Sequence, residues 1–310
     1  MESCVAYIVF NRPRHTRETF AAVRAHRPDK LFIIADGPRP GHPTDGERCR
    51  EVREVVSEID WPCQVFRNVA AQNLGLKNRV SSGLDWVFGQ VEHAIILEDD
   101  CLPHSDFFLF CNALLERYQE DEKVSVITGD NFQGGQKRGA ASYYFSRYNH
   151  CWGWATWRRA WRYYQGNIPF WPEWKRSTDW LQLLPASRER RYWEKIFDRV
   201  WSGKVNSWAY PWTASIWHKG GLTATPNVNL VTNIGLGPEG THVLALDDST
   251  GIPSISLGPL SHPDFVVKDC EADTHTFENW YDGANNRLHR RLMLAGRLLA
   301  GRMLGRWVAV

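Results

Sequence analysis

The sequence predicts an α/β fold in which a mainly parallel β-sheet is flanked by helices. Short apolar runs, typical of buried strands, alternate along the first part of the chain with longer stretches that suit amphipathic helices. Polar or acidic residues directly follow several of the apolar runs. Because alternating strands and helices form parallel sheets, and these bind ligands at the carboxyl ends of their strands, we expect a site at that edge. We expect the sheet to belong to one compact domain with two parts.

The first part of the chain supplies the alternation. Residues 5–10 are apolar and end at Asn11-Arg12-Pro13, which indicates a buried strand followed by a turn. The pattern repeats in residues 30–35, which end at Asp36-Gly37-Pro38. In chain order, we expect a strand at 5–10, a helix at 14–27, a strand at 30–35, a helix at 45–59, a strand at 63–68, a loop and helix within 73–90, and a strand at 93–100.

The second part of the chain is rich in tryptophan. Most of the sixteen Trp residues lie between Trp152 and Trp217. They fit either a packed core or exposed platforms on which sugar rings stack, since an indole has an apolar face with a polar edge. Here we expect a helix at 106–119, a strand at 123–129, a glycine-rich loop at 133–140, a short helix at 211–219, and a strand-like, turn-rich segment at 222–243.

These patterns divide the chain into a ligand-binding half at 1–120, a Trp-rich half at 121–265 and a C-terminal tail at 266–310. The tail contains a basic amphipathic stretch, in which Leu288, Leu292 and Leu299 share a helical face and arginines surround them. Such a helix can lie on an anionic membrane surface or dock on its own domain, and both interpretations stay open.

Composition excludes several classes of protein. A net charge of +2 with dispersed basic residues argues against a nucleic-acid partner. No apolar run approaches the roughly 20 residues of a membrane span, and the N-terminal run is too short for a signal peptide. The seven cysteines show no regular spacing. We therefore expect reduced thiols and a cytoplasmic location, with peripheral contact at the inner membrane face under the interpretation in which the basic tail lies on the membrane.

An acidic cluster is the most informative feature of the sequence. The apolar residues 94–97 run directly into Glu98, Asp99 and Asp100. Charge runs usually belong to solvated loops, but the apolar residues fix this one at the end of a strand. Mn²⁺ or Mg²⁺ commonly bridges carboxylates to phosphates, and such a cation would offset both the carboxylate repulsion and the charge on a leaving diphosphate.

The motif strand-EDD-x-x-P-x-x-x-F-F resembles the metal-binding segment of nucleotide-sugar glycosyltransferases with the GT-A (Rossmann-like) fold, eukaryotic N-acetylglucosaminyltransferase I above all. "QNLGLKNRVSSGLDWVF", "WGWATWRRAW" and "PNVNLVTNIGLGPEGTH" resemble segments of the bacterial hemolytic-protein-like sugar transferases. The resemblance covers roughly residues 5–245. It implies that residues 1–120 bind a nucleotide-sugar and that the Trp-rich half binds the acceptor.

The resemblance also implies a role for each matching residue. It makes Asp100 the direct metal ligand and places Glu98 and Asp99 at the ribose and donor sugar. It places Asp36 at the uracil, with Asn11 and Arg12 beside the uridine. It places Lys77 and Arg79 at the uridine or diphosphate, and His242 at the metal or a phosphate. Two of these positions have a structural alternative. Asp36 also fits an ordinary Asp-Gly-Pro turn, and a lone histidine such as His242 is more often structural.

The expected catalytic base is missing. An inverting transferase needs a carboxylate to take the proton from the attacking hydroxyl. The resemblance implies an Asp in a segment like W-D-Y-x-W, yet this chain has Ala209 between Trp208 and Tyr210. An engineered substitution, a natural variant that uses Asp179, Glu239 or Asp247 instead, or a non-catalytic relative would each explain Ala209. An Asp there could also be a helix N-cap, because position 209 lies just before the expected helix.

The resulting hypothesis is an inverting, metal-dependent transfer from a UDP-sugar, with UDP-GlcNAc the family-based donor, to a saccharide or lipid-linked acceptor in bacterial surface glycan synthesis. Trp152, Trp154 and Trp212 are the candidate walls of the acceptor site. A nucleotidyltransferase is disfavoured because no glycine-rich loop follows the first strand. A protein that binds the nucleotide-sugar or a glycan without turnover is the alternative.

Overall fold

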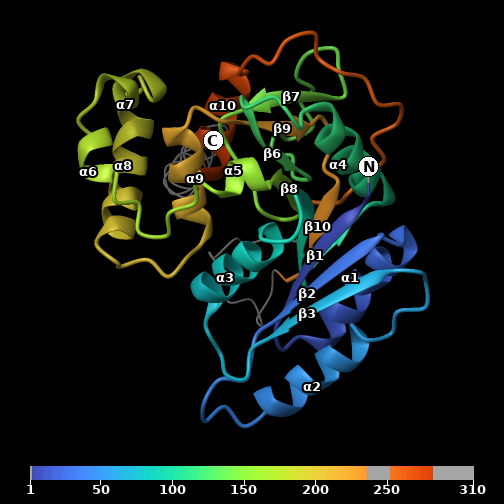
Figure 1. Ribbon diagram of the computed structural model, residues 1–310. Coiled ribbons are helices and arrows are strands. Elements are labelled where there is room, and N and C mark those ends of the chain that lie inside the picture. The colour runs from blue at the N-terminus through green and yellow to red at the C-terminus, as the bar shows by residue number, and fades with distance from the viewer. Residues whose placement is uncertain (1, 236–251, 282–310) are drawn as a thin grey trace, which may run out of the picture.

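The computed structural model describes residues 2–235 and 252–281 and centres on an eight-stranded sheet with the order β3-β2-β1-β4-β8-β6-β9-β7 (Figure 1). The strands are β1 (Cys4–Val9), β2 (Lys30–Ala35), β3 (Gln64–Val69), β4 (His93–Glu98), β6 (Val124–Thr128), β7 (Tyr143–Ser146), β8 (Trp154–Trp157) and β9 (Leu222–Pro226), and a second, two-stranded sheet pairs β5 (Cys101–Pro103) with β10 (Val231–Asn233). β1 pairs in parallel with β2 and β4, β2 with β3, and β6 with β9. This topology confirms the predicted α/β fold with a mainly parallel sheet.

The helices are α1 (Pro13–His26), α2 (Asp45–Val55), α3 (Leu76–Phe88), α4 (Ser105–Arg117), α5 (Arg158–Trp161), α6 (Trp171–Trp174), α7 (Thr178–Leu183), α8 (Ser187–Trp201), α9 (Ala209–His218) and α10 (Cys270–Thr276), with a π-helical turn η1 (Phe277–Tyr281) after α10. Elements predicted in the first part of the chain are present within a few residues of the expected bounds. Among the bounds that differ, α2 ends at Val55 and β4 ends at Glu98. In the second part of the chain, α9 begins at Ala209, two residues before the predicted start.

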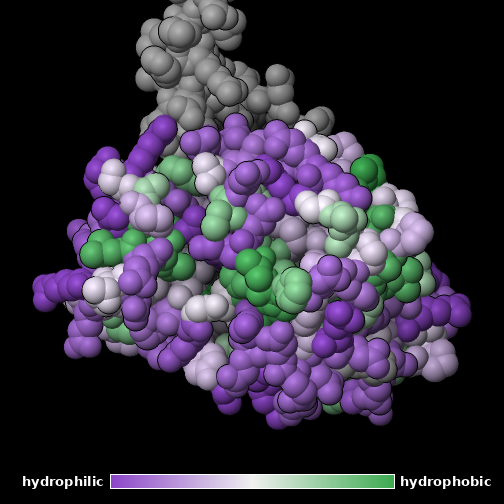
Figure 2. Space-filling view, turned by 90° about the horizontal axis from the view of Figure 1, so that it is seen from above, coloured by the Kyte–Doolittle hydropathy of each residue, from purple (hydrophilic) through white to green (hydrophobic). Residues whose placement is uncertain are grey.

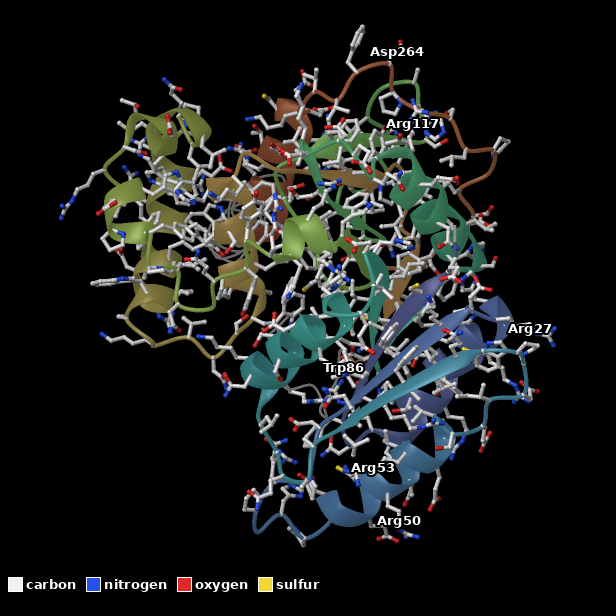
Figure 3. The ribbon with its side chains drawn as sticks, viewed as in Figure 1. Arg27, Arg50, Arg53, Trp86, Arg117 and Asp264 are labelled. Carbon is white, nitrogen blue, oxygen red and sulfur yellow. The ribbon has the colours of Figure 1, made fainter. Side chains whose placement is uncertain are left out.

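Side chains that alternate along β1 pack on opposite faces of the sheet. Ala6 and Ile8 face a core that contains α3 and the Trp-rich segment, whereas Val5 and Tyr7 face a core that contains α1, α2 and α4. On the first face, Trp86 of α3 packs edge-on against Phe32 of β2, with ring centroids 5.5 Å apart (Figure 3). Helices on both faces bury β1 and nearly all of β2, which explains their continuous apolar sequence, whereas the edge strand β3 is partly exposed.

Much of the Trp-rich segment forms a helical lobe, made of α6, α7 and α8, that the sequence did not predict. The lobe stands to one side of the sheet (Figure 1). Trp171, Trp180 and Trp193 are at most 1% exposed and pack against one another or against Phe197. Of the two interpretations of the tryptophans, a packed core is therefore the correct one for most of them.

The two predicted halves share the sheet. β6, β8, β9 and β7 come from residues after 120, and β8 inserts antiparallel between β4 and β6. Part of the predicted tail also packs on this body, because Ser146 Oγ of β7 donates to Asp273 Oδ1 of α10 at 2.6 Å. The amphipathic stretch with Leu288, Leu292 and Leu299 lies outside the described residues.

All seven cysteines lie in the described part of the chain and are free thiols, as predicted. Within residues 2–235 and 252–281, no helix is both long and apolar enough to cross a bilayer. The face of the molecule shown in Figure 2 is mainly hydrophilic, with smaller hydrophobic areas interspersed.

Candidate functional site

The acidic cluster lies at the carboxyl end of β4, beside the end of β1. The backbone N–H of Phe10 donates to Asp99 Oδ2 at 3.2 Å, and Arg12 Nη1 lies 2.7 Å from Asp100 Oδ2 and 3.5 Å from Asp99 Oδ1. Arg12, predicted to border the uridine, is thus paired with two of the three carboxylates. Parallel pairing of β1 with β4 brings these residues together, since Ile8 is the register partner of Glu98.

Burial makes the ionised cluster costly. Desolvation, followed by the charges of Asp100 and Asp99, raises the pKa of Glu98 to about 8. Desolvation and Asp100 likewise raise the pKa of Asp99 to about 7, although Arg12 opposes the shift. Arg12 therefore offsets part of the negative charge, and a further cation at the cluster would favour the ionised carboxylates.

The cluster suits a divalent cation that is bound by protein and substrate together, and not one that is enclosed by protein ligands alone. In the described ranges, no three His, Cys, Asp or Glu side chains are placed to hold a metal ion by themselves. Asp100, half-buried at the rim of the cluster, can supply one or two carboxylate oxygens. Mg²⁺ and Mn²⁺ are commonly held by one or two carboxylates while substrate phosphates and water complete the shell, so this donor set suits a cation that arrives with a diphosphate.

Asp36 organises the loops that follow β2 and β3. Its Oδ1 accepts hydrogen bonds from the backbone N–H groups of Gly37 at 2.8 Å and Leu74 at 2.9 Å, and its Oδ2 accepts from Asn73 Nδ2 at 3.0 Å. A Cβ on Gly37 would lie 2.4 Å from the backbone of Gln72, so these two loops can approach only with glycine at 37. Asp36 thus shapes the edge of the sheet at which the sequence predicts a uracil contact.

The other predicted nucleotide-binding residues lie at the same edge and have partners within the protein. Asn11 Nδ2 donates to Asp45 Oδ1 at 2.8 Å, and Arg79 Nη2 donates to Asn68 Oδ1 at 3.0 Å. Lys77, at the start of α3, donates to Asn167 Oδ1 at 3.2 Å. Arg79 is only 4% exposed, and burial lowers the pKa of its guanidinium.

Two of the three predicted acceptor walls are wrong. Trp154 and Trp212 are each 1% exposed, and Trp154 stacks on Trp208 with centroids 5.4 Å apart. Because both indoles are enclosed by other rings, neither has a face free for a sugar. Trp152, in contrast, is only half-buried and lies in the loop that enters β8.

Ala209 is the first residue of α9, so position 209 is not the N-cap that the sequence predicts; Trp208 is. The next residue, Tyr210, has a pKa raised by burial and then by Cys151. The Cys151 thiol in turn has a pKa raised by burial and by Glu98, Asp130 and Asp100. Cys151 is therefore within electrostatic reach of Tyr210 and of the acidic cluster, whereas Ala209 itself packs against the apolar core on that face of the sheet.

The other candidate bases do not meet the cluster in the described parts. Asp179 is exposed in the first turn of α7, in the helical lobe away from β1 and β2 (Figure 1). Glu239 and Asp247 lie outside the described residues, as does His242, the second predicted metal or phosphate ligand.

Sequence reasoning missed Asp130, which follows β6. Its Oδ2 accepts a hydrogen bond from the backbone N–H of Trp152 at 2.9 Å, and its Oδ1 is buried without a hydrogen-bond partner. Burial raises the pKa of Asp130 well above its ordinary value. A signal was present, because Asp130 is an acidic residue just beyond a predicted strand.

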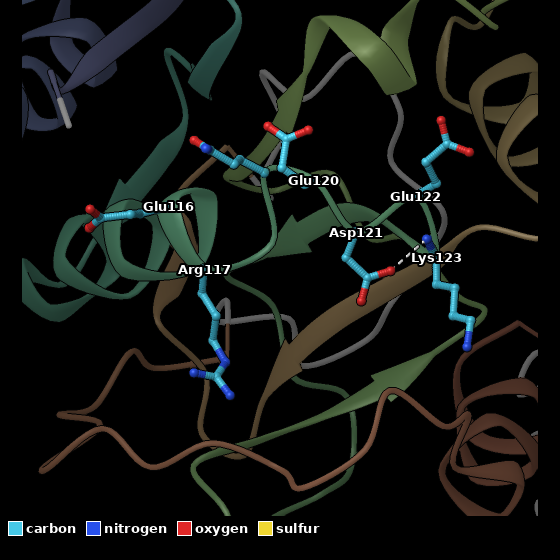
Figure 4. A pocket seen from close by; sticks show the side chains of 7 residues that line it. Glu116, Arg117, Glu120, Asp121, Glu122 and Lys123 are labelled. Carbon is cyan, nitrogen blue, oxygen red and sulfur yellow. Dashed lines mark hydrogen bonds between the residues drawn. The ribbon is translucent and has the colours of Figure 1, made fainter.

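A hollow of about 740 Å³ near the start of β6 is not a candidate site (Figure 4). It is lined by Glu116, Arg117, Gln119, Glu120, Asp121, Glu122 and Lys123. These residues precede β6, so they lie at the amino end of the strand, opposite the edge at which such sheets bind ligands. Asp121 uses one oxygen to accept from the backbone N–H of Lys123 at 2.9 Å.

No protein-family model matches this sequence, and no curated protein matches it. Among solved structures, it is similar to the mannosyltransferase PcManGT from Pyrobaculum calidifontis in complex with GDP-Man and Mn²⁺, with 12% identity and a TM-score of 0.33 over 51% of this chain and 46% of that one. An apo UDP-glucose pyrophosphorylase matches with 8% identity and a TM-score of 0.34 over 74% and 93% of the two chains. The 4-diphosphocytidyl-2C-methyl-D-erythritol synthase of Anaerococcus prevotii matches with 10% identity and a TM-score of 0.32 over 57% and 78%. This chain therefore spans less than half of the mannosyltransferase, and at these values the likeness carries no argument about activity.

Proposed function

We propose that this chain is a metal-dependent glycosyltransferase that moves a sugar from a UDP-sugar to a saccharide acceptor. The observation that carries the proposal is the acidic cluster at the carboxyl end of β4, in which Asp99 is buried and Glu98 and Asp100 are half-buried. Glu98 and Asp99 have raised pKa values, and Asp99 and Asp100 share one described arginine, Arg12. Such a cluster favours a bound cation, and the edge of the sheet at which it lies favours a nucleotide.

In this proposal Asp100 would hold the Mn²⁺ or Mg²⁺ that arrives with the donor diphosphate. The bound cation would stabilise the negative charge that develops on the leaving diphosphate. Asp99, fixed by Phe10 N–H and Arg12, and Glu98 orient the ribose and donor sugar by accepting hydrogen bonds from their hydroxyl groups. Arg12 tempers the repulsion within the cluster.

The nucleoside binds along the ends of β1, β2 and β3. Asp36 and the loop that it organises border the uracil, Asn11 borders the uridine, and Lys77 and Arg79 at the start of α3 face the uridine or diphosphate. An edge with fixed hydrogen-bonding groups would orient the donor, and orientation alone can lower a barrier substantially.

The acceptor hydroxyl must lose its proton as the anomeric bond breaks, and position 209 is where the sequence resemblance places the base. Alanine cannot accept a proton, so this chain either uses another carboxylate or does not turn over. A protein that binds the nucleotide-sugar without transfer is the second candidate function, and Ala209 is the observation that favours it.

The donor sugar GlcNAc, inversion at the anomeric carbon, a role in bacterial surface glycan synthesis and peripheral contact with the membrane are the finer parts of the proposal. The sequence resemblance is their support. The proposed role of His242 at the metal or a phosphate has the same basis.

Two measurements test the proposal. Isothermal titration with UDP should show binding in the presence of Mn²⁺ that is at least tenfold weaker with EDTA. Release of UDP from UDP-GlcNAc and other UDP-sugars should be faster for Ala209→Asp than for the native chain. Equal UDP affinity with Mn²⁺ and with EDTA would refute the metal-bridged site, and UDP binding without turnover by either form would favour the binding protein.

A further inference from the structure

The loop after β6, residues 129–133, holds two tryptophans that belong to distant parts of the chain. Asp130 Oδ2 accepts from the backbone N–H of Trp152 at 2.9 Å. Gln133, which is fully buried, donates from Nε2 to Ala272 O at 3.2 Å and to Thr276 Oγ1 at 2.8 Å, so it fastens α10 and the following turn η1 that carries Trp280.

Phe132 lies between these two anchors and contacts both indoles. Its ring stacks on Trp280, with centroids 3.9 Å apart and an interplanar angle of 28°, and meets Trp152 edge-on at 5.5 Å. Trp152 and Trp280 stand at 85° to each other with centroids 5.6 Å apart, and both are half-buried. We call the two indoles and the phenyl ring beneath them the aromatic corner.

The register of the sheet places the aromatic corner next to the acidic cluster. Thr128 of β6 pairs with Trp154 of β8, and Trp154 pairs with Ile96 of β4. Asp130 and Glu98 therefore leave the same edge of the sheet two strands apart, which corresponds to about 10 Å. Because β8 is antiparallel, the chain enters it at this edge, and Trp152 lies between the ends of β4 and β6.

The chemistry of the aromatic corner suits a pyranose ring. A pyranose has apolar C–H faces that pack on an indole and hydroxyl groups around its rim that donate hydrogen bonds. The corner offers two perpendicular indole faces, while Asp130 Oδ1 and Asn149 Oδ1 nearby in the chain are buried acceptors without a hydrogen-bond partner. Core packing would account for the rings, but it would not account for the unpaired Oδ1 of Asp130, whose Oδ2 binds the Trp152 backbone.

We propose that the aromatic corner is the acceptor subsite and binds a pyranose ring of the saccharide, with Trp280 as the residue that closes it. Its role in transfer rests on the proposed function, whereas binding of the sugar does not. The corner keeps Trp152 of the predicted walls and replaces Trp154 and Trp212 with Trp280.

Saturation-transfer NMR with the full chain tests binding without a donor. The probes are methyl β-N-acetylglucosaminide, methyl β-galactoside and methyl α-mannoside at millimolar concentration. At least one probe should receive saturation from the native chain. Its affinity should fall tenfold or more in Trp280→Leu, which keeps apolar bulk, and should stay close to the native value in Trp280→Phe, which keeps an aromatic ring. Trp201→Leu, at an indole 53% exposed on α8, is the matched control and should bind as the native chain does.

Melting temperatures establish that each variant is folded. If Trp280→Leu does not fold, indole Nε1–H signals assigned in the native chain decide the matter: the pyranoside must shift those of Trp152 and Trp280 and leave Trp201 in place. No binding of any probe, or equal binding by Trp280→Leu, would overturn the subsite. A UDP titration that fails while Trp280-dependent sugar binding persists would refute the proposed function alone.

Discussion

Gly235→Ala should displace the proposed metal ligand while leaving the fold intact. Gly235 follows β10, whose pairing with β5 brings it against the acidic cluster, and Ile234 N–H donates to Asp100 O at 2.8 Å. A Cβ at 235 would lie 2.3 Å from Asp100 Oδ2 and 2.7 Å from Asp100 Cβ. Because the Asp100 Cβ itself is in the way, rotation of the carboxylate alone cannot relieve the contact.

The magnitude follows from the size of the forced shift. Ordinary contact begins at 3.4 Å, so Oδ2 must retreat from 2.3 Å by roughly 1 Å. A misplacement of about 1 Å costs on the order of 100-fold when a group must meet a fixed geometry, or about 2.8 kcal/mol. We therefore expect the affinity for UDP with Mn²⁺ to fall about 100-fold in Gly235→Ala.

Calorimetric titration of UDP measures the effect, and Gly46→Ala is the control. Gly46 lies in α2 and has no atom within 4 Å of the position of an added Cβ, so alanine there should preserve UDP affinity and stabilise the helix by about 0.5–1 kcal/mol. With EDTA, Gly235→Ala and the native chain should bind UDP equally weakly. Native affinity for UDP and Mn²⁺ in folded Gly235→Ala would refute the assignment of Asp100 as the metal ligand.

Three further predictions concern the helix start and the ionisable groups. Ala209→Asp should raise the free energy of unfolding by about 0.3–1 kcal/mol, because α9 has no acidic residue in its first turn and a carboxylate there favours the helix dipole; a fall of 1 kcal/mol or more in urea titration would contradict this. Asp45→Ala should lower the free energy of unfolding by about 2 kcal/mol, because it removes the fully buried carboxylate that accepts from Arg39 Nε at 2.6 Å. The bond to Arg39 first, and the bond to Asn11 next, lower the pKa of Asp45, so the carboxylate stabilises the fold above its unfolded pKa near 3.9 and this stabilisation is lost as pH falls. A loss of stability in Asp45→Ala that does not shrink in acid would refute the reasoning. Burial lowers the pKa of His26 to about 4, below its unfolded value near 6.5. Between pH 7 and pH 5 the free energy of unfolding of the native chain should therefore fall by on the order of 1 kcal/mol more than that of His26→Phe. Melting temperatures with the same pH dependence in the native chain and in His26→Phe would contradict this prediction.

The first part of the fold was predictable because local pattern and tertiary role agree there. Strands such as β1 and β2 are continuous apolar runs ended by Asn11 and Asp36, and burial on both faces produces that pattern. β8 was not predictable, because its four residues WATW lie within a Trp-rich stretch without strand periodicity, and their position between β4 and β6 depends on pairing over long sequence separations.

The site divides in the same way. Asp99, Asp100 and Arg12 meet as expected for residues that follow neighbouring parallel strands. Which tryptophans keep an open face could not be read from composition, because Trp152 and Trp154 are two residues apart and differ only in what packs over them. The role of Trp280 could not be predicted from the sequence either, because its contact with Phe132 depends on how α10 packs against the rest of the domain.

The central claim is that the carboxylates after β4 hold a cation shared with a nucleotide diphosphate. Titration of Mn²⁺ into the chain with UDP present, for the native protein, Asp100→Asn and Glu116→Gln, tests it most directly. Glu116 is an exposed carboxylate at the opposite edge of the sheet. The claim predicts that one Mn²⁺ binds tightly and only when UDP is present, that its affinity falls at least tenfold in Asp100→Asn, and that its affinity is unchanged in Glu116→Gln. Mn²⁺ binding that does not depend on UDP, or that is unchanged by loss of the Asp100 charge, would contradict the claim.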